Sequence, residues 1–130
     1  MEVQWSDDFD RQLSRLEDAA ERSTRDRRIL ELLAYMLDNL RQLRQEPAVE
    51  SAMFKRVRQS GHHLVWRQSH PFEPGIALRL ICWFPPNMES IVVALFTGEK
   101  ASMGDVFYDS VGTRADQIVE QWIREQEGES

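Results

Sequence analysis

The spacing of apolar residues changes once along this chain, near Pro47, and that change limits the fold more than any other feature. Before it, apolar residues recur every three to four positions over 9–20 and, more strongly, over 26–43, as in two amphipathic helices. After it come short β-rich stretches separated by three turn signals, QSG at 59–61, PFEPG at 71–75 and PPN at 85–87. Two helices followed by several strands predict an α+β domain.

Each end of the chain adds one element. The stretch EVQW at 2–5 alternates as a short strand does, and Ser6 after it is a favourable N-cap with two aspartates in the first turn. Near the other end, Thr113 is predicted to cap a final helix. The sequence thus predicts an antiparallel sheet of about four strands with two N-terminal helices and one C-terminal helix. We expect one domain over 1–125 and a polar tail over 126–130.

The stretch ALRLICWF at 77–84 is the clearest predicted strand, and its alternation assigns a face to each residue. Four residues should face the helices as part of the core, Leu78, Leu80, Cys82 and Phe84. If the helices cover that face, Arg79 stands on the open face of the sheet, where a fixed guanidinium suits a phosphate or a carboxylate. The alternative is structural, with Arg79 paired to a neighbouring glutamate or stacked on Trp83.

The charges are distributed unevenly. The formal net charge of −6 argues against a surface covered with phosphate-binding side chains. Residues 52–101 nevertheless carry 6 basic and 3 acidic side chains, whereas residues 1–51 carry 8 and 12, and residues 102–130 carry 2 and 7. The three histidines also lie in the basic segment, at His62, His63 and His70. Any surface for a nucleic acid is therefore predicted within 52–101.

The sequence argues against several kinds of site. Cys82 is the single cysteine, so no internal disulfide can form. His62 and His63 are adjacent on a predicted strand and point to opposite sides, which argues against a zinc site. Neither a nucleophile elbow nor a glycine-rich phosphate loop is present. With no apolar run near 18 residues and an acidic N-terminus, we expect a cytoplasmic protein without a membrane segment, metal or cofactor.

Three more side chains are candidates for chemistry. His63 shares a strand face with Arg67, either as a titrating group beside a cation or as a solvated histidine at a strand start. Lys100 follows the predicted strand SIVVALF, and Tyr108 lies beyond it. A lysine also ends strands and a tyrosine also anchors loops, so the sequence leaves both roles open.

Taken together, these stretches resemble the RelE/ParE superfamily of toxins from bacterial toxin–antitoxin systems. The resemblance rests on LVWRQS, on the mid-strand arginine of LRLICWF, on GEK after an apolar strand and on the tyrosine of VFYDSV. It covers about residues 3–122 in the order of elements and about 63–111 in sequence. The resemblance implies a β-α-α-β-β-β-α fold.

For the activity, the resemblance implies a ribosome-dependent, metal-independent endonuclease that cuts mRNA and so inhibits translation. The expected catalytic residues, with the histidine added as the nearest group for proton transfer, are Arg79, Lys100, Tyr108 and His63. The expected RNA-binding residues are Arg67, Arg58 and Lys55. RNA cleavage needs a base for the 2′-hydroxyl, cations for the charge growing on the phosphate and an acid for the leaving oxygen. We therefore expect the catalytic set to converge on one phosphate-sized spot beside Arg67.

The same resemblance leaves a second function open. Some of these nucleases carry two lysines where this chain has His63 and Val65. Other members share the fold but inhibit a protein target such as DNA gyrase without cutting RNA. Either kind of toxin implies a cognate antitoxin, of helix-turn-helix or other DNA-binding type. We expect its inhibitory segment to be rich in Lys and Arg, to cover Arg79 or its neighbours and to use apolar anchors. The other expected partners are the ribosome and mRNA for a nuclease, or gyrase for an inhibitor.

Overall fold

The computed structural model describes residues 1–58, 61–100 and 105–128, without the side chains of 105–109. Its elements are β1 (Glu2–Trp5), α1 (Asp7–Ala20), α2 (Thr24–Gln42), β2 (Phe54–Arg56), β3 (Val65–Gln68), β4 (Leu78–Trp83), β5 (Ile91–Glu99) and α3 (Asp105–Gly128). The strands form one sheet in the order β1-β5-β4-β3-β2, in which β1 pairs parallel with β5 and the other neighbours are antiparallel. The predicted α+β class with two N-terminal helices and one C-terminal helix is confirmed, with five strands in the described residues.

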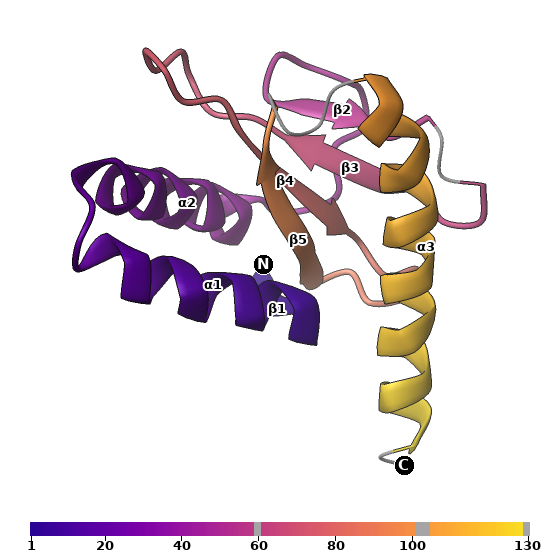
Figure 1. The fold of residues 1–130 in the computed structure, drawn as a ribbon. Helices are drawn as coiled ribbons and strands as arrows, with labels where there is room; N and C mark the ends of the chain where they lie inside the picture. The colour runs from indigo at the N-terminus through magenta and orange to yellow at the C-terminus, as the bar shows by residue number, and fades with distance from the viewer. Residues whose placement is uncertain (59–60, 101–104, 129–130) are drawn as a thin grey trace.

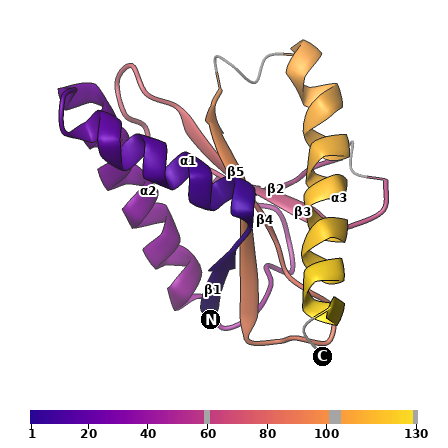
Figure 2. The same cartoon turned by 60° about the horizontal axis from the view of Figure 1, so that its bottom comes forward.

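The first two helices begin where the sequence places good caps. The side chain of Ser6 accepts a hydrogen bond from the backbone N–H of Phe9 at 3.1 Å, as predicted, and Ser23 does the same for Asp26 at 3.2 Å. The Ser6 hydroxyl also donates to the carbonyl of Leu95, which fixes the start of α1 to β5. Figure 2 shows α1 and α2 as a pair on one side of the sheet.

The face of the sheet under α1 and α2 holds the larger core. The four residues of β4 and its exit that were predicted to face the helices are all buried there, Leu78, Leu80, Cys82 and Phe84. They pack against the apolar stripe of α2, which includes Leu33, Met36 and Leu40. Burial raises the pKa of the Cys82 thiol, so this cysteine stays protonated and acts as a small apolar side chain.

The expectation that the opposite face is open is wrong, because α3 packs on it (Figure 1). Its apolar stripe buries the residues of that face in a second core, with Val111, Ala115, Ile118, Val119 and Trp122 against Ile81, Trp83, Val93, Leu95 and Phe96. The prediction of a helix start at Thr113 is also wrong. The helix begins at Asp105, and Val111 is already part of the stripe that packs on the sheet, so packing outweighs the local preference of Thr113 for a cap. At its other end α3 runs through Gly128, into the segment predicted as a tail.

The turn predictions fit the backbone where the structure describes it. Gly75, in the connection from β3 to β4, has a φ of 76°, and Asn87, in the connection from β4 to β5, has a φ of 70°. Glycine and asparagine are the residues that adopt this left-handed region at least cost. Residues 59 and 60 of the third predicted turn lie outside the described part of the chain.

The strand β5 is longer than its partner β1. Pairing with β1 ends at Ala94, and beyond it the side chain of Gln12 replaces the missing strand. Its Oε1 accepts from the backbone N–H of Thr97 at 2.8 Å, and its Nε2 donates to the carbonyl of the same residue at 2.8 Å. The end of β5 is therefore held to α1.

One buried polar side chain interrupts the larger core. Gln68 on β3 is fully buried, and its Nε2 donates to the carbonyl of Met36 at 2.9 Å, while its Oε1 is buried without a hydrogen-bond partner in the described structure. We expect Gln68→Leu to leave the free energy of unfolding within about 1 kcal/mol of the wild type, or to raise it, because the Met36 carbonyl keeps its place in the helical ladder. Urea unfolding measures this. A loss above about 2 kcal/mol would mean that the amide contributes net stability.

No helix among the described residues is long and apolar enough to cross a membrane.

Candidate functional site

Four basic residues from separate segments lie near one another where β4 begins and β5 ends. We call this set the basic corner, and it consists of Lys55, Arg67, Arg79 and Lys100. Lys55 on β2 is directly opposite Arg67 on β3. Arg67 is opposite Ile81, so Arg79 occupies the diagonal position on the same face, a spacing of about 7–8 Å in a sheet. The backbone N–H of Lys100 donates to the carbonyl of Ala77 at 2.7 Å, which places Lys100 beside the start of β4.

The two arginines of the basic corner are held by their surroundings. Both are half-buried, and the Nε atom of each is shielded from solvent. Arg79 donates from Nη1 to the carbonyl of Leu78 at 2.9 Å, and its own carbonyl accepts from the hydroxyl of Thr97 at 2.7 Å. The residue opposite Arg79 on β5 is Gly98, which has no side chain to occupy the space above that strand. A guanidinium with a buried stem presents a limited set of orientations, which suits bidentate binding of a phosphate or carboxylate.

The start of α3 lies at the same end of the sheet. This helix begins at Asp105, five residues after Lys100, and both views show its first turn near the end of β5 (Figures 1 and 2). Tyr108 belongs to this part of α3 and not to a segment before the helix; its side chain lies outside the described residues.

The structure does not bring His63 to the basic corner. In the register of β3 with β4, Arg79 is level with Ser69, six residues after His63, or about 20 Å along a strand. His63 instead lies against α3. Its ring contacts Trp83 edge-on at 5.9 Å between centroids, and its Nε2 is 3.8 Å from Oε1 of Glu120. Its role in any chemistry at the corner is therefore not supported by its position.

The remaining sequence candidates divide in the same way. Lys55 is exposed on the edge strand and belongs to the corner. Arg58 lies beyond β2, is exposed, and pairs with Glu50 at 3.3 Å. The sequence left open that Arg79 stacks on Trp83. The structure instead holds that indole edge-on against Trp122, with 5.6 Å between the ring centroids. The corner thus brings together Lys55, Arg67, Arg79 and Lys100, and leaves out Arg58 and His63.

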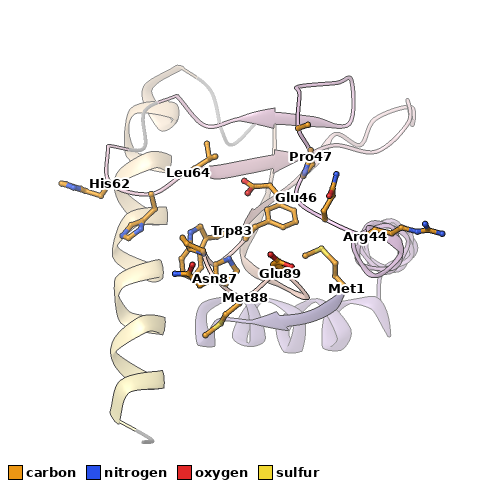
Figure 3. A pocket seen from close by; sticks show the side chains of 16 residues that line it. Met1, Arg44, Glu46, Pro47, His62, Leu64, Trp83, Asn87, Met88 and Glu89 are labelled. Atoms are coloured by element: carbon orange, nitrogen blue, oxygen red, sulfur yellow. The ribbon is translucent and has the colours of Figure 1, made fainter.

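Sequence reasoning missed a hollow at the opposite end of the sheet, which we call the end groove. It is lined by Met1 and by residues 44–48, 62–64 and 83–89, and its volume is about 740 Å³ (Figure 3). Glu46 accepts a hydrogen bond from the indole Nε1 of Trp66 at 2.8 Å, which orients its carboxylate. The only local signals for the end groove were an apolar Leu64 beside two histidines and a methionine after PPN. These signals are insufficient because the groove forms only where four segments meet. Within the described residues, no group of three His, Cys, Asp or Glu is placed to hold a metal ion.

Comparison of the chain with protein-family models, with curated proteins and with solved structures finds no match. What the chain does is therefore inferred from the arrangement of its own side chains.

Proposed function

We propose that this chain is the toxin of a toxin–antitoxin pair and that it cuts mRNA on the ribosome, as the resemblance to the RelE/ParE superfamily implies. The observation that carries the proposal is the basic corner. In a protein with a net charge of −6, four cations from β2, β3, β4 and the end of β5 lie together on one face. The order of elements also agrees with the resemblance, apart from one additional short strand.

The corner suits a phosphodiester. The guanidinium groups of Arg67 and Arg79 bind the scissile phosphate and the charge that grows on it during cleavage, because their buried stems keep the donors in place. Lys55 and Lys100 are exposed on either side and attract the neighbouring phosphates. Tyr108, from the start of α3, orients or stacks on a base. His63 takes no part in this proposal, since it lies about 20 Å along the strand direction.

An antitoxin that neutralises such a toxin would cover the basic corner. Four cations favour acidic side chains in the segment that lies directly over them. The Lys- and Arg-rich composition expected from the acidic flanks of the chain would then apply only to parts of the antitoxin that lie over 1–51 or 102–130.

A second candidate, a non-catalytic inhibitor of a protein target such as gyrase, is favoured by one specific observation. The histidine expected to transfer protons lies away from the corner, against Trp83 of β4 and near Glu120 of α3. An inhibitor needs only the cations, which would pair with acidic side chains of its target.

The test is induction of the wild-type chain and of Arg79→Ala in bacterial cells, with growth and the 5′ ends of cellular mRNA followed over time. We expect the wild type to arrest growth and to create new mRNA ends, and Arg79→Ala to lower cleavage by roughly 100-fold, the typical effect of removing one donor to a transition-state charge. The matched control is Arg124→Ala, which removes an exposed arginine of α3 far from the corner and should act as the wild type.

Each other outcome has a definite meaning. Arrest without new mRNA ends would replace the nuclease by the protein-target inhibitor. Equal activity of Arg79→Ala and the wild type, with equal melting temperatures, would show that the basic corner is not the site. Absence of arrest by a folded wild-type chain would overturn the toxin proposal.

A further inference from the structure

The basic corner contains every lysine of the chain. Of the 16 lysines and arginines in the sequence, only Lys55 and Lys100 are lysines, and all the others are arginines. The two kinds of cation differ in their chemistry. A guanidinium stays charged, whereas a lysine amine can lose its proton and be acylated, which removes the charge of the side chain. A modification directed at lysine side chains would therefore act on the basic corner alone.

Both lysines are open to a reagent. Each is exposed, Lys55 on the edge strand β2 and Lys100 directly after the end of β5. Within the described residues neither ammonium group forms an ion pair, in contrast to Arg25, Arg28 and Arg58. Acylation of either lysine would therefore break no ion pair that the structure describes, so it should cost the fold little.

Each lysine has an arginine of the corner as its neighbour on the same face of the sheet. Lys55 is directly opposite Arg67, a position in which the two Cβ atoms lie about 4.5–5.5 Å apart. Lys100 lies beside Ala77, through its backbone hydrogen bond of 2.7 Å. Ala77 shares the face of Arg79, because residues two apart on an extended chain point the same way. A phosphate group bound by either guanidinium would therefore lie close to a lysine amine.

An acyl phosphate fits this pairing of an arginine with a lysine. Its phosphate is the group that a guanidinium recognises, and its acyl carbon, one oxygen away, is the electrophile. The lysine ammonium first releases a proton to water, and Nζ then attacks the acyl carbon. A C–N amide bond forms, the C–O bond to the phosphate breaks, and inorganic phosphate leaves with a further proton from Nζ. Binding accelerates this step because it holds the amine and the acyl carbon together.

We propose that Lys55 and Lys100 are sites at which an acyl phosphate modifies this chain, and that their acylation switches off the basic corner. Each acylation lowers the formal net charge of −6 by one unit and removes one of the four cations of the corner. Arginines at these positions would carry the same charge without this sensitivity. The loss of RNA binding rests on the proposed function, whereas the acylation rests only on the arrangement of the lysines and arginines.

The test is acetylation of the purified chain by acetyl phosphate, with the rate at each amine read by peptide mass spectrometry. N-acetoxysuccinimide carries the same acetyl group without a phosphate, so it reports the intrinsic reactivity of each amine. The α-amino group of Met1 is the internal reference, since it donates to the carbonyls of Arg41 and Leu43 and lies by the end groove. We expect acetyl phosphate to favour Lys55 and Lys100 over Met1 at least about tenfold more than N-acetoxysuccinimide does.

Two changes should abolish this preference at Lys55. Inorganic phosphate in excess competes for the guanidinium group of Arg67, and Arg67→Gln removes that group while keeping much of the apolar stem. The matched control is Arg124→Ala, which removes an exposed arginine of α3 and should be acetylated as the wild type is. Equal preferences of the two reagents would overturn the proposal. So would a preference that survives both excess phosphate and Arg67→Gln in a chain that melts as the wild type does.

The loss of charge is read from the binding of a single-stranded RNA oligonucleotide at several salt concentrations. Each lost phosphate contact should reduce the slope of log affinity against log salt by about 0.7, so acetylation of both lysines should reduce it by about 1.4. The double variant Lys55→Arg, Lys100→Arg is compared with itself before and after treatment, and its slope should not change. A wild type that keeps its slope when both lysines are acetylated would overturn the switch.

Failure of the proposed function would look different. An untreated chain that binds no RNA would count against the nuclease, while the mass spectra would still decide whether the two lysines are acylated. The switch would then be read by elution of the chain from phosphocellulose, a phosphate-bearing matrix. Acetylation of both lysines should lower the salt concentration at which the chain elutes, and an unchanged elution would overturn the switch.

Discussion

Replacing Leu33 by alanine should lower the free energy of unfolding by about 2–5 kcal/mol. Leu33 is completely buried between α2 and the sheet, among residues of α1, β4 and β5. Its removal forfeits the transfer free energy of the side chain and leaves a cavity that a helix held along its whole length cannot close. Urea unfolding followed by circular dichroism measures the loss, because a single domain of this size usually unfolds in one transition.

The control for this prediction is on the same helix. Tyr35 is 46% exposed, so Tyr35→Ala should change the free energy of unfolding by no more than about 0.5 kcal/mol. If Leu33→Ala cost as little as Tyr35→Ala, Leu33 would not be buried between α2 and the sheet.

Replacing Asp116 by alanine should lower the free energy of unfolding by roughly 3–6 kcal/mol, the sum expected for two hydrogen bonds to a charged group. Asp116 is a buried residue of α3, and its carboxylate receives the backbone N–H of Gly61 at Oδ2, 3.1 Å, and that of His63 at Oδ1, 3.2 Å. It therefore ties the segment before β3 to α3. In Asp116→Ala, hydrogen exchange should also become faster at the backbone N–H groups of Gly61 and His63, because they lose their acceptor and with it their protection.

Asp116→Asn is the matched variant for this prediction. An asparagine keeps one acceptor oxygen but replaces the other by an NH₂ group, which cannot accept a hydrogen bond. We therefore expect the free energy of unfolding of Asp116→Asn to lie between that of the wild type and that of Asp116→Ala. Wild-type stability of Asp116→Ala would mean that the two backbone N–H groups find other acceptors.

The periodicity of apolar residues predicted most of the fold because burial decides which face of an element points inward. The stripe of α2 and the alternation of β4 both held in detail, down to Leu78, Leu80, Cys82 and Phe84 in the core. The start of α3 was missed because the preference of a threonine for a helix cap is a local effect of about 1 kcal/mol. Val111 is helical because it packs on strands that are distant in sequence. For the same reason the sequence did not reveal that α3 covers the second face.

The candidate site was predictable in part. Alternation alone places Arg67 and Arg79 each on a defined face of its strand. Their proximity, however, depends on the pairing of Arg67 with Ile81, and register is set by the turns and by burial of the whole hairpin. His63 was expected beside them because it shares a face with Arg67, but β3 begins only at Val65, and the preceding segment is drawn to Asp116. The end groove could not be predicted, since it exists only where four segments meet.

The parallel pairing of β1 with β5 also constrains the order in which the chain can fold. Glu2 is in register with Ile91, so the first strand must wait until nearly three quarters of the chain has been synthesised before it finds its partner. The neighbouring strands β3, β4 and β5 join through short connections and are expected to form first, because closing a short loop costs less entropy. Until β1 arrives, the edge of β5 is exposed to pairing with other chains. The slowest and most aggregation-prone step of folding should therefore be the docking of the first five residues.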